Sequence, residues 1–303
     1  MQNYFRFFMN FIIYFAFGGI AYQNELLFSI LSYFNFHKAD ENQIIIYSDS
    51  TFFFKNKLPQ SITYIELAND EITNWKGKHN FVHRVKVKVI EDVVSKYEGN
   101  FLYLDSDTYF TKNCSEIFNN INSNAIYFDK CEGKLIDNKG GIARKMRAFL
   151  KNENEFKIPS LNETIKIDFD FTVWNAGIIG FNSSYSNQLK MVEELVDELY
   201  SKNQLFVMEQ IAFNYFFQKQ TNPLESINYI HHYWYFKEFR GVLSHFFEHN
   251  KSKSFEEMIV EIDKINPEYL SSEKRAYKKM SFWKKQFHKI QKGRKWKILD
   301  YKL

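Results

Sequence analysis

The first two thirds of the chain alternates between short runs of continuous apolar residues and longer segments in which apolar residues recur every three or four positions. Runs such as Phe11–Phe17 and Gln43–Ser48 are typical of strands buried on both faces of a sheet. Helical spacing separates them, as in Phe81–Tyr97, where four valines from Val82 to Val93 fall on one face. This alternation predicts an α/β fold with a doubly wound, mostly parallel central sheet and flanking helices.

The same two patterns predict the remaining elements. The other predicted strands are Ile62–Leu67, Phe101–Leu104, Ala125–Phe128, the strictly alternating Ile165–Phe171, and Ala176–Phe181. The other predicted helices are Asn24–Phe36, Gly140–Leu150, Gln188–Tyr200 and Glu209–Gln218. Residues beyond about Lys251 lose the strand alternation. We therefore expect one α/β domain over residues 1–250 and a helical C-terminal appendage over residues 251–303.

The N-terminal stretch Tyr4–Tyr22 is nearly all apolar and invites interpretation as a signal or membrane anchor. Arg6 and Asn10 interrupt it, and the uninterrupted run Phe11–Phe17 is far shorter than the ~20 residues of a spanning helix. No small-residue cleavage site follows. The pattern favours a buried strand that ends at a glycine pair.

Composition limits the class of protein. Hydrophobic residues make up 45% of the 303 residues and charged residues 25%, which predicts a large packed core and excludes wholesale disorder. The two cysteines, Cys114 and Cys131, form no C-x-x-C pair, disulfide framework or thiolate zinc site. We expect both to be reduced thiols in a cytoplasmic protein.

Charge is unevenly distributed. The net charge is +4, yet residues 273–303 hold twelve Lys/Arg against two acids, so this tail carries +10 and the remainder −6. Between Tyr277 and Ile290, apolar residues recur at helical spacing among lysines. Such a basic amphipathic helix favours an anionic membrane surface over nucleic acid, because nucleic acid would leave the apolar stripe exposed. The alternative is a helix packed on the main domain with its basic face in water.

A pair of carboxylates follows one predicted central strand. Asp105-Ser106-Asp107 comes directly after Phe101–Leu104, at the sheet edge where open sheets bind ligands. Neighbouring carboxylates repel unless a cation lies between them, and their hard oxygens suit Mg²⁺ or Mn²⁺. The alternative is a capping pair at a strand exit. A second pair, Asp168-Phe169-Asp170, lacks this context.

Four short segments within Phe11–Arg240 are informative about function when they are considered together. They are Tyr103–Asp107, Trp174–Asn182, Glu209-Gln210, and Ile230–Tyr233 followed by Lys237. In type and order they resemble the DxD, Asn-Ala-Gly, Asp-Gln and late His…Lys segments of GT-A nucleotide-sugar glycosyltransferases, in the style of glycosyltransferase family 8 and its relatives. The chain departs from that pattern in having Glu209 before the glutamine and no glycine between the histidines and Lys237. The metal-binding histidine, His231 or His232, and the donor sugar therefore stay open.

The resemblance implies a GT-A-like, Rossmann-like catalytic domain with a Mn²⁺ or Mg²⁺ site. It implies that Asp107 ligates the cation, that Asp105 shares the cation or holds the ribose, and that His232 or His231 completes the protein ligands. The residues that would contact substrate are Phe17, Gly18, Tyr22, Arg84, Lys88, Ser106, Asn175, Ala176, Gly177 and Lys237. Gln210 would lie near the anomeric carbon. Glu209, Asp168 and Asp170 are spare carboxylates, one of which would be the general base of an inverting enzyme, whereas retention by front-face attack needs none. For Arg84 and Lys88 the alternative is a solvated helix face.

These motifs predict a metal-dependent glycosyltransferase that moves a sugar from a UDP-sugar to a hydroxyl of a glycan or lipid-linked oligosaccharide. The expected location is cytoplasmic, peripheral at the inner face of the membrane. Two other function classes stay open, namely a non-catalytic protein that binds nucleotide-sugars or carbohydrates, and a nucleotide-sugar or glycan hydrolase. His245 and His249 lie one helical turn apart, but the order does not match the H-E-x-x-H of zinc proteases.

Overall fold

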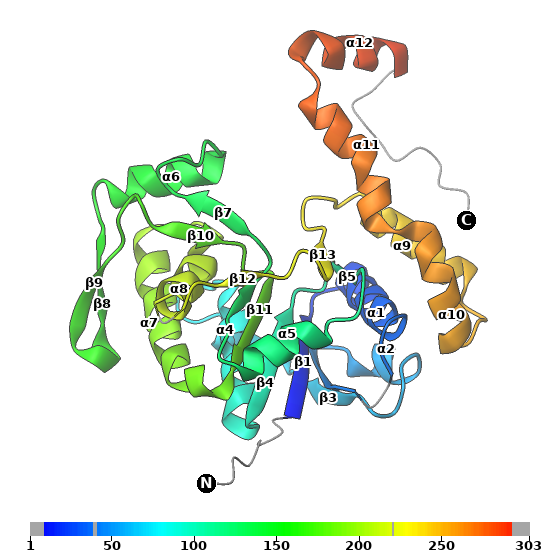
Figure 1. The fold of residues 1–303 in the computed structure, drawn as a ribbon, viewed down its shortest axis with the longest axis horizontal. Helices are drawn as coiled ribbons and strands as arrows, with labels where there is room; N and C mark the ends of the chain where they lie inside the picture. Colours follow the sequence, from blue (N-terminus) through cyan, green and yellow to red (C-terminus); the bar gives the residue numbers. More distant parts are fainter. Residues whose placement is uncertain (1–8, 39–40, 220, 293–303) are drawn as a thin grey trace.

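A seven-stranded sheet forms the centre of the molecule (Figure 1). The computed structural model describes residues 9–38, 41–219 and 221–292. In spatial order the strands are β12 (Leu224–Glu225), β6 (Tyr127–Phe128), β11 (Ile178–Asn182), β4 (Gly99–Leu104), β1 (Met9–Ala16), β2 (Gln43–Ser48) and β3 (Thr63–Glu66). Among these strands only β11 runs against its neighbours. The predicted mostly parallel sheet is confirmed.

The order of the strands reverses between β1 and β4. From β1 the chain passes to β2 and β3 on one side, and later returns to β4 on the other side of β1. Open α/β sheets bind ligands at the carboxyl ends of strands at such a switch point. Gly18 follows β1 and Asp105 follows β4, so both lie at this edge.

Helices cover both faces of the sheet. One face packs against α3 (Asn69–Trp75), α4 (Arg84–Lys96), α7 (Ser186–Lys202) and α8 (Met208–Phe217). The other face packs against α1 (Ile20–Phe34), α2 (Thr51–Lys55), α5 (Ser115–Asn122) and α9 (Phe239–His249). Within β1, Phe11 and Ile13 belong to the first core, whereas Ile12 and Tyr14 belong to the second. Burial on both faces explains why the strands are continuous apolar runs.

Three two-stranded sheets surround the central one. They are β5 (Thr108–Phe110) with β13 (Ile230–His232), β7 (Cys131–Lys134) with β10 (Thr172–Trp174), and β8 (Glu155–Ile158) with β9 (Glu163–Lys166). The helix α6 (Gly141–Leu150) follows β7, and short 3₁₀ turns occupy Pro159–Leu161 and Ser183–Tyr185. Strands of two to four residues show no clear periodicity, so the sequence pattern does not predict most of them.

Two expectations from the sequence are wrong. Ile165–Phe171 is not one strand, because β9 ends first and a turn follows, closed by a 3.1 Å hydrogen bond from the Phe171 N–H to the Asp168 carbonyl. The valine stripe also starts later than expected, since Val82 precedes α4 and is exposed. In both segments the apolar spacing continues through a turn. The spacing alone therefore does not show where β9 ends or where α4 begins.

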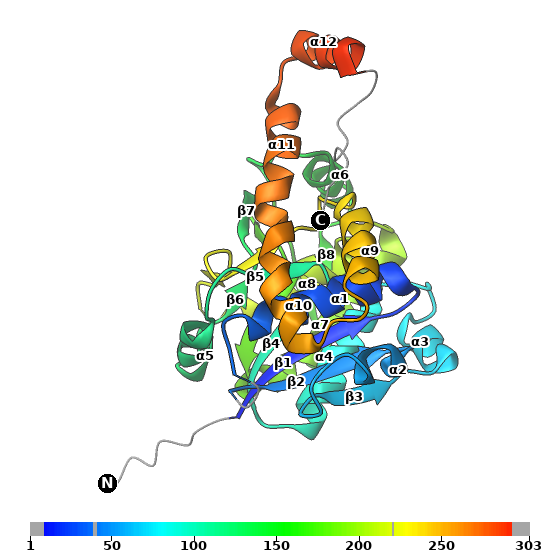
Figure 2. The same cartoon turned by 90° about the vertical axis from the view of Figure 1, so that its right-hand side faces the viewer.

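The C-terminal residues are helical, as predicted. They form α10 (Phe255–Glu261), a 3₁₀ turn (Ile262–Ile265), α11 (Pro267–Lys279) and α12 (Phe282–Lys292). Met258, Ile262 and Ile265 belong to the same core as α1, so α10 packs on the main domain. In contrast, α11 leads away from the sheet and α12 lies across its far end (Figure 2). The division at residue 250 stays a prediction.

The expected N-terminal strand is confirmed as β1. Within the described residues, no helix is both long and apolar enough to cross a membrane. Cys114 is buried and Cys131 is exposed, and neither forms a disulfide. Residues 293–303, which carry part of the predicted basic tail, lie outside the described residues.

Candidate active site

The switch-point edge brings the Asp-x-Asp pair beside the Asn175–Gly177 segment. β4 delivers Asp105 to the edge, and the antiparallel β11 begins immediately after Gly177. The Asp105 N–H donates to the Gly177 carbonyl at 2.7 Å. One strand pairing therefore unites two of the four segments identified in the sequence.

His232 reaches the site through the β5–β13 pair. β5 starts directly after Asp107, and in the antiparallel register Thr108 lies opposite His232. The Tyr233 N–H then donates to the Asp107 carbonyl at 3.0 Å. This pairing, rather than local sequence, places an imidazole beside a carboxylate 125 residues away.

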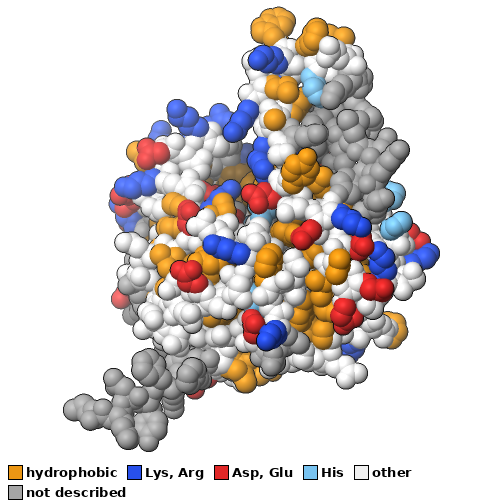
Figure 3. Space-filling view, turned by 45° about the vertical axis from the view of Figure 1, so that its right-hand side comes forward, with side chains coloured by type: hydrophobic (Ala, Val, Ile, Leu, Met, Phe, Trp, Pro, Cys, Tyr) orange, Lys and Arg blue, Asp and Glu red, His pale blue; other side chains and the backbone are white. Residues whose placement is uncertain are grey.

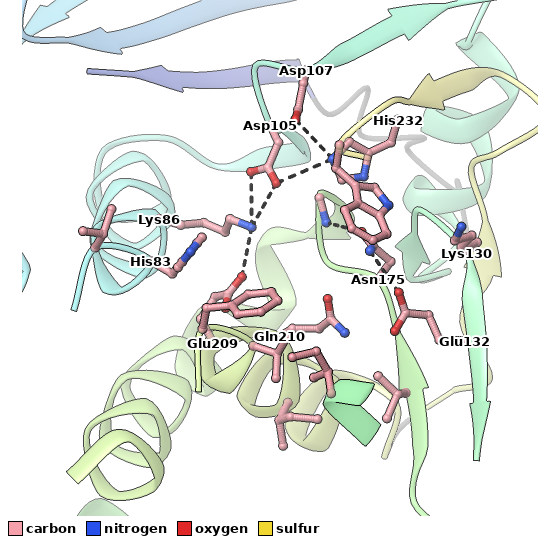
Figure 4. Close-up of a pocket in the computed structure, with 18 of the residues that line it drawn as sticks. His83, Lys86, Asp105, Asp107, Lys130, Glu132, Asn175, Glu209, Gln210 and His232 are labelled. Carbon is pink, nitrogen blue, oxygen red and sulfur yellow. Dashed lines mark hydrogen bonds and ion pairs between the residues drawn. The ribbon is translucent and has the colours of Figure 1, made fainter. Parts of the chain in front are cut away.

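Asp105, Asp107 and His232 form a cluster that could hold a metal ion (Figure 4). Each offers one ligand atom, and these atoms lie within 4.8 Å of one another. The His232 Nε2 is 3.2 Å from Asp107 Oδ1 and 3.9 Å from Asp105 Oδ2. The other ring nitrogen, Nδ1, is 3.2 Å from Asp129 Oδ2. A carboxylate behind a ligating imidazole fixes the orientation of the ring.

Opposite charges compensate one another within the cluster. Burial lowers the pKa of His232, but its hydrogen bonds to Asp107 and Asp129 more than offset this effect and raise the pKa to about 10. Burial raises the pKa of Asp107, but His232 and the Lys237 ammonium at 2.8 Å hold it well below its usual range. In this arrangement the His232 imidazolium and the Lys237 ammonium both compensate the charge of the Asp107 carboxylate.

Gly177 provides the space that His232 occupies. A Cβ atom at this position would lie 2.0 Å from the His232 Cε1. The Gly177 N–H donates to the Asn175 side-chain oxygen at 3.0 Å, so the turn before β11 is held by its own asparagine. The glycine of the Asn-Ala-Gly segment is therefore required by contact with the imidazole.

The pattern of α4 does not single out its most important polar residue, Lys86. This buried lysine lies 3.2 Å from Asp105, 3.3 Å from Glu209 and 3.0 Å from the Ala176 carbonyl. Figure 4 shows its side chain reaching between the two carboxylates. Burial lowers the pKa of Lys86, but Asp105 and Glu209 more than offset this and raise it. The second Glu209 oxygen, Oε2, is buried with no hydrogen-bond partner among the described residues.

These groups line one pocket of about 1140 Å³. Typical small-molecule sites occupy ~300–1,000 Å³, so the pocket has room for more than one small ligand. Asn175, Glu209 and Gln210 line it, as do Ser106, between the two aspartates, and Lys237, which pairs with Asp107. Residues of α6, β7 and α8 form a further part of the lining. Ala176, a predicted substrate contact, is buried and does not line the pocket, and its N–H donates to Gln210 Oε1 at 3.4 Å.

The loop after β1 forms one wall of the pocket. Phe17 and Gly18 line it, and so does Tyr22 in the first turn of α1. Gly18 has φ +86°, a conformation that favours glycine, and its N–H donates to Asp49 Oδ2 at 2.9 Å. The Arg240 guanidinium lies over the Tyr22 ring, 4.4 Å from its centroid. The turn is thus fixed on both sides, with an aromatic ring facing the pocket.

Arg84 and Lys88 are not at the pocket, which corrects their predicted placement at donor phosphates. Arg84 Nε donates to Asp197 at 2.7 Å, and its Nη2 is 2.5 Å from Glu193. Lys88 also pairs with Glu193, at 3.2 Å. Both residues join α4 to α7. Residues four apart share a helix face, and here that face meets a helix.

Asp170 and His231 also lie outside the pocket lining. Asp170 is exposed on the turn between β9 and β10, so the structure does not bring this carboxylate to the site. Adjacent residues of a strand point to opposite faces, so His231 points away from the cluster that holds His232. Its Nε2 lies 3.5 Å from the Tyr235 hydroxyl, and burial together with Arg275 lowers its pKa to about 4.

Comparisons with known proteins give no family and no close relative. No protein-family profile matches the chain, and no curated protein matches it in sequence. Several solved structures are similar to this chain in backbone fold, and glycosyltransferases are among them.

One is the glycosyltransferase GlyE of Streptococcus pneumoniae TIGR4, at 14% identity, covering 79% of this chain and 50% of GlyE, with a TM-score of 0.45. Another is the galactosyltransferase LgtC, solved with donor and acceptor sugar analogues, at 12% identity, covering 77% of this chain and 95% of LgtC, with a TM-score of 0.47. Mouse xyloside xylosyltransferase 1 matches at 11% identity over 68% of this chain and 80% of its own, with a TM-score of 0.43. The chain spans about half the length of GlyE, so we infer function from the residues of the pocket.

Proposed function

We propose that the protein is a metal-dependent glycosyltransferase that moves a sugar from a UDP-sugar to a hydroxyl of a glycan or a lipid-linked oligosaccharide. The observation that carries the proposal is the convergence of Asp105, Asp107 and His232 within 4.8 Å, at the switch-point edge of the sheet and inside a large pocket. Such an arrangement suits a substrate that brings a diphosphate. A lipid-linked acceptor implies a cytoplasmic enzyme, peripheral at the inner face of the membrane.

The donor set fits Mn²⁺, and also Mg²⁺. Two carboxylate oxygens and one imidazole nitrogen from Asp105, Asp107 and His232 are the mixed hard and borderline ligands that suit Mn²⁺. The space at Gly177 admits the ring in this position. When bound, the cation supplies Lewis-acid neutralisation of charge on the departing diphosphate.

Residues of the chain would position the sugar donor. The exposed Lys237 ammonium pairs with Asp107 and is free enough to turn to a phosphate oxygen. The first turn of α1 presents Tyr22 to a base, and the loop after β1 presents the backbone near Gly18 to a nucleoside. Lys86 fixes the orientation of both Asp105 and Glu209 through ion pairs.

The centre of the pocket offers acceptors for sugar hydroxyls. Glu209 Oε2 has no partner among the described residues, and a hydroxyl donor would satisfy this buried oxygen. The Asn175 and Gln210 amides face the same space (Figure 4). Because Glu209 is paired with Lys86, we assign it to holding the donor sugar, with Gln210 beside the anomeric carbon.

The test measures UDP release from a panel of UDP-sugars with Mn²⁺, with and without candidate acceptors. The wild-type protein should release UDP with at least one donor, and Asp107→Asn should remove most of this activity because metal binding is weakened. The second Asp-x-Asp pair provides a matched control. Asp170→Asn changes an exposed carboxylate outside the pocket and should leave activity unchanged.

Product analysis separates the alternatives. UDP release that needs an acceptor and gives a glycosylated product supports the transferase. Release with free sugar as the main product, whatever acceptor is added, would indicate a hydrolase. Metal-dependent binding of UDP-sugars without turnover across the whole panel would indicate a binding protein.

A further inference from the structure

The C-terminal helix α12 carries an apolar face that nothing in the described chain covers. Phe282, Trp283, Phe287 and Ile290 are 65%, 79%, 61% and 78% exposed. On a helix of 3.6 residues per turn these four side chains fall on one side. Scattered apolar residues on a surface are ordinary, but four large ones on eleven residues form a contact surface.

The contacts of α12 with α11 fix which way this face points. The His288 ring lies 5.2 Å from the Tyr277 ring, and Lys285 Nζ donates to the Lys278 carbonyl at 2.9 Å. His288 and Lys285 therefore mark the side of α12 that faces α11. The four apolar residues lie on the other side and point away from the domain.

The exposed apolar stripe is shorter than the sequence predicts. The amphipathic stripe expected from Tyr277 to Ile290 is not one helix, because α11 ends at Lys279 and Met280 is extended. Tyr277 packs inward on His288, so the exposed stripe is confined to α12. The break turns α12 across the end of α11, where the helix forms a tip of the molecule (Figure 2).

Basic residues surround the apolar face. The sequence of α12 itself, residues 282–292, holds four lysines and no acid. Lys284 and Lys289 are exposed on α12 itself. Figure 3 shows apolar side chains at this tip with basic side chains close by. An aromatic face with lysines on its flanks matches the boundary between headgroups and acyl chains of an anionic bilayer.

We propose that α12 docks in the plane of an anionic lipid membrane, with Phe282, Trp283, Phe287 and Ile290 among the acyl chains and the lysines at the headgroups. A second copy of the chain suits this surface less, because pairing two α12 faces would bring their lysines together. Nucleic acid would leave the aromatic residues in water. The proposal does not depend on the reaction that the pocket performs.

Helix α11 connects the apolar face of α12 to a loop at the pocket. Arg275 donates to the Tyr235 hydroxyl at 2.9 Å, and Lys274 donates to the Tyr235 carbonyl at 2.8 Å. Tyr235 lies in the loop between His232, the last residue of β13, and α9, and this loop also contains Lys237. Docking of α12 would therefore also fix the orientation of the pocket relative to the lipid surface.

The experiment is co-sedimentation of the full chain with vesicles of phosphatidylcholine alone or with 30% phosphatidylglycerol, over a salt series, without donor or acceptor. Binding should require the anionic lipid and weaken as salt rises, since screening grows. Trp283→Ala with Phe287→Ala should reduce partitioning by about tenfold or more. Lys284→Gln with Lys289→Gln should do the same through lost charge.

Matched controls use exposed residues elsewhere. Phe52→Ala removes a 76% exposed aromatic ring on α2, and Lys55→Gln removes an exposed charge of the same helix. Both should leave vesicle binding unchanged, and thermal unfolding should confirm that every variant is folded. Absence of binding at low salt would overturn the proposal, and so would binding that the α12 variants do not weaken. Loss of a solution dimer in the Trp283/Phe287 variant, without vesicle binding by the wild type, would assign the face to a second copy.

Discussion

Gly177 lacks a side chain where the His232 ring needs the space. The first prediction is that Gly177→Ala lowers Mn²⁺ affinity by about tenfold or more, because a Cβ placed 2.0 Å from the ring displaces a proposed ligand. Metal titration without nucleotide measures this directly. Gly241→Ala is the control, since a Cβ added there would meet open space, and it should bind the metal like the wild type. Equal affinity in both variants would contradict the assignment of His232.

Asp129 acts behind the same imidazole. It is buried and lies 3.2 Å from the His232 Nδ1, on the side of the ring away from Asp107. Asp129→Asn should lower Mn²⁺ affinity by about 10–100-fold, the usual effect of removing a carboxylate that orients a ligating histidine. The fold should persist, as checked by thermal unfolding. An unchanged metal affinity would show that Asp129 does not position the ring.

His37 makes stability depend on pH, far from the pocket. Its Nε2 accepts from the Cys114 N–H at 3.0 Å, and its Nδ1 is 2.5 Å from Glu41. Burial lowers the pKa of His37, which Glu41 opposes only in part. The folded pKa lies below the unfolded value of about 6.5, so this stability is present above pH 6.5 and is lost as the pH falls toward the folded pKa.

Urea unfolding between pH 7.5 and 5 measures this effect. The wild-type free energy of unfolding should fall over this range, and His37→Gln should show a shallower fall. His245→Gln, at an exposed position on α9, should keep the wild-type pH dependence. If His37→Gln has the wild-type slope, another group causes the loss of stability.

At the scale of elements, α4 presents polar residues to two different neighbours. Arg84→Gln should lower the free energy of unfolding by about 1–3 kcal/mol, because its hydrogen bonds to Asp197 and Glu193 on α7 are lost. It should leave UDP affinity unchanged. Lys86→Gln should instead impair donor turnover, because Asp105 and Glu209 lose their shared cation. If Arg84→Gln weakened UDP binding, Arg84 would have to be assigned to the donor site after all.

The alternation of valine and basic residues on α4 explains why the sequence assigns its faces wrongly. Arg84 and Lys88 share a face four residues apart, which invites a functional assignment, whereas Lys86 lies between them on another face. The tertiary neighbours of each face decide the roles, and no local pattern contains them. Long apolar strands such as β2 are predicted to the residue because they are buried on both sides.

At the scale of the whole molecule, strand pairing assembles the cluster from distant segments. The sequence predicts Asp105 and Asp107 at a strand exit, but it leaves His231 and His232 as alternatives. The register of β13 against β5 favours His232, and this pairing involves only three residues on each strand. Asp129 escapes prediction for the same reason, since it meets the imidazole only across the folded chain.

The most direct measurement is UDP affinity by calorimetry, with Mn²⁺ and with a chelator, for the wild type, Asp107→Asn and the exposed control Asp170→Asn. We predict that Mn²⁺ strengthens UDP binding by at least about tenfold in the wild type and in Asp170→Asn, and that Asp107→Asn removes the effect, since metal and phosphate share one site. UDP affinity that is independent of Mn²⁺ in the wild type, or a metal effect that survives in Asp107→Asn, would contradict the account.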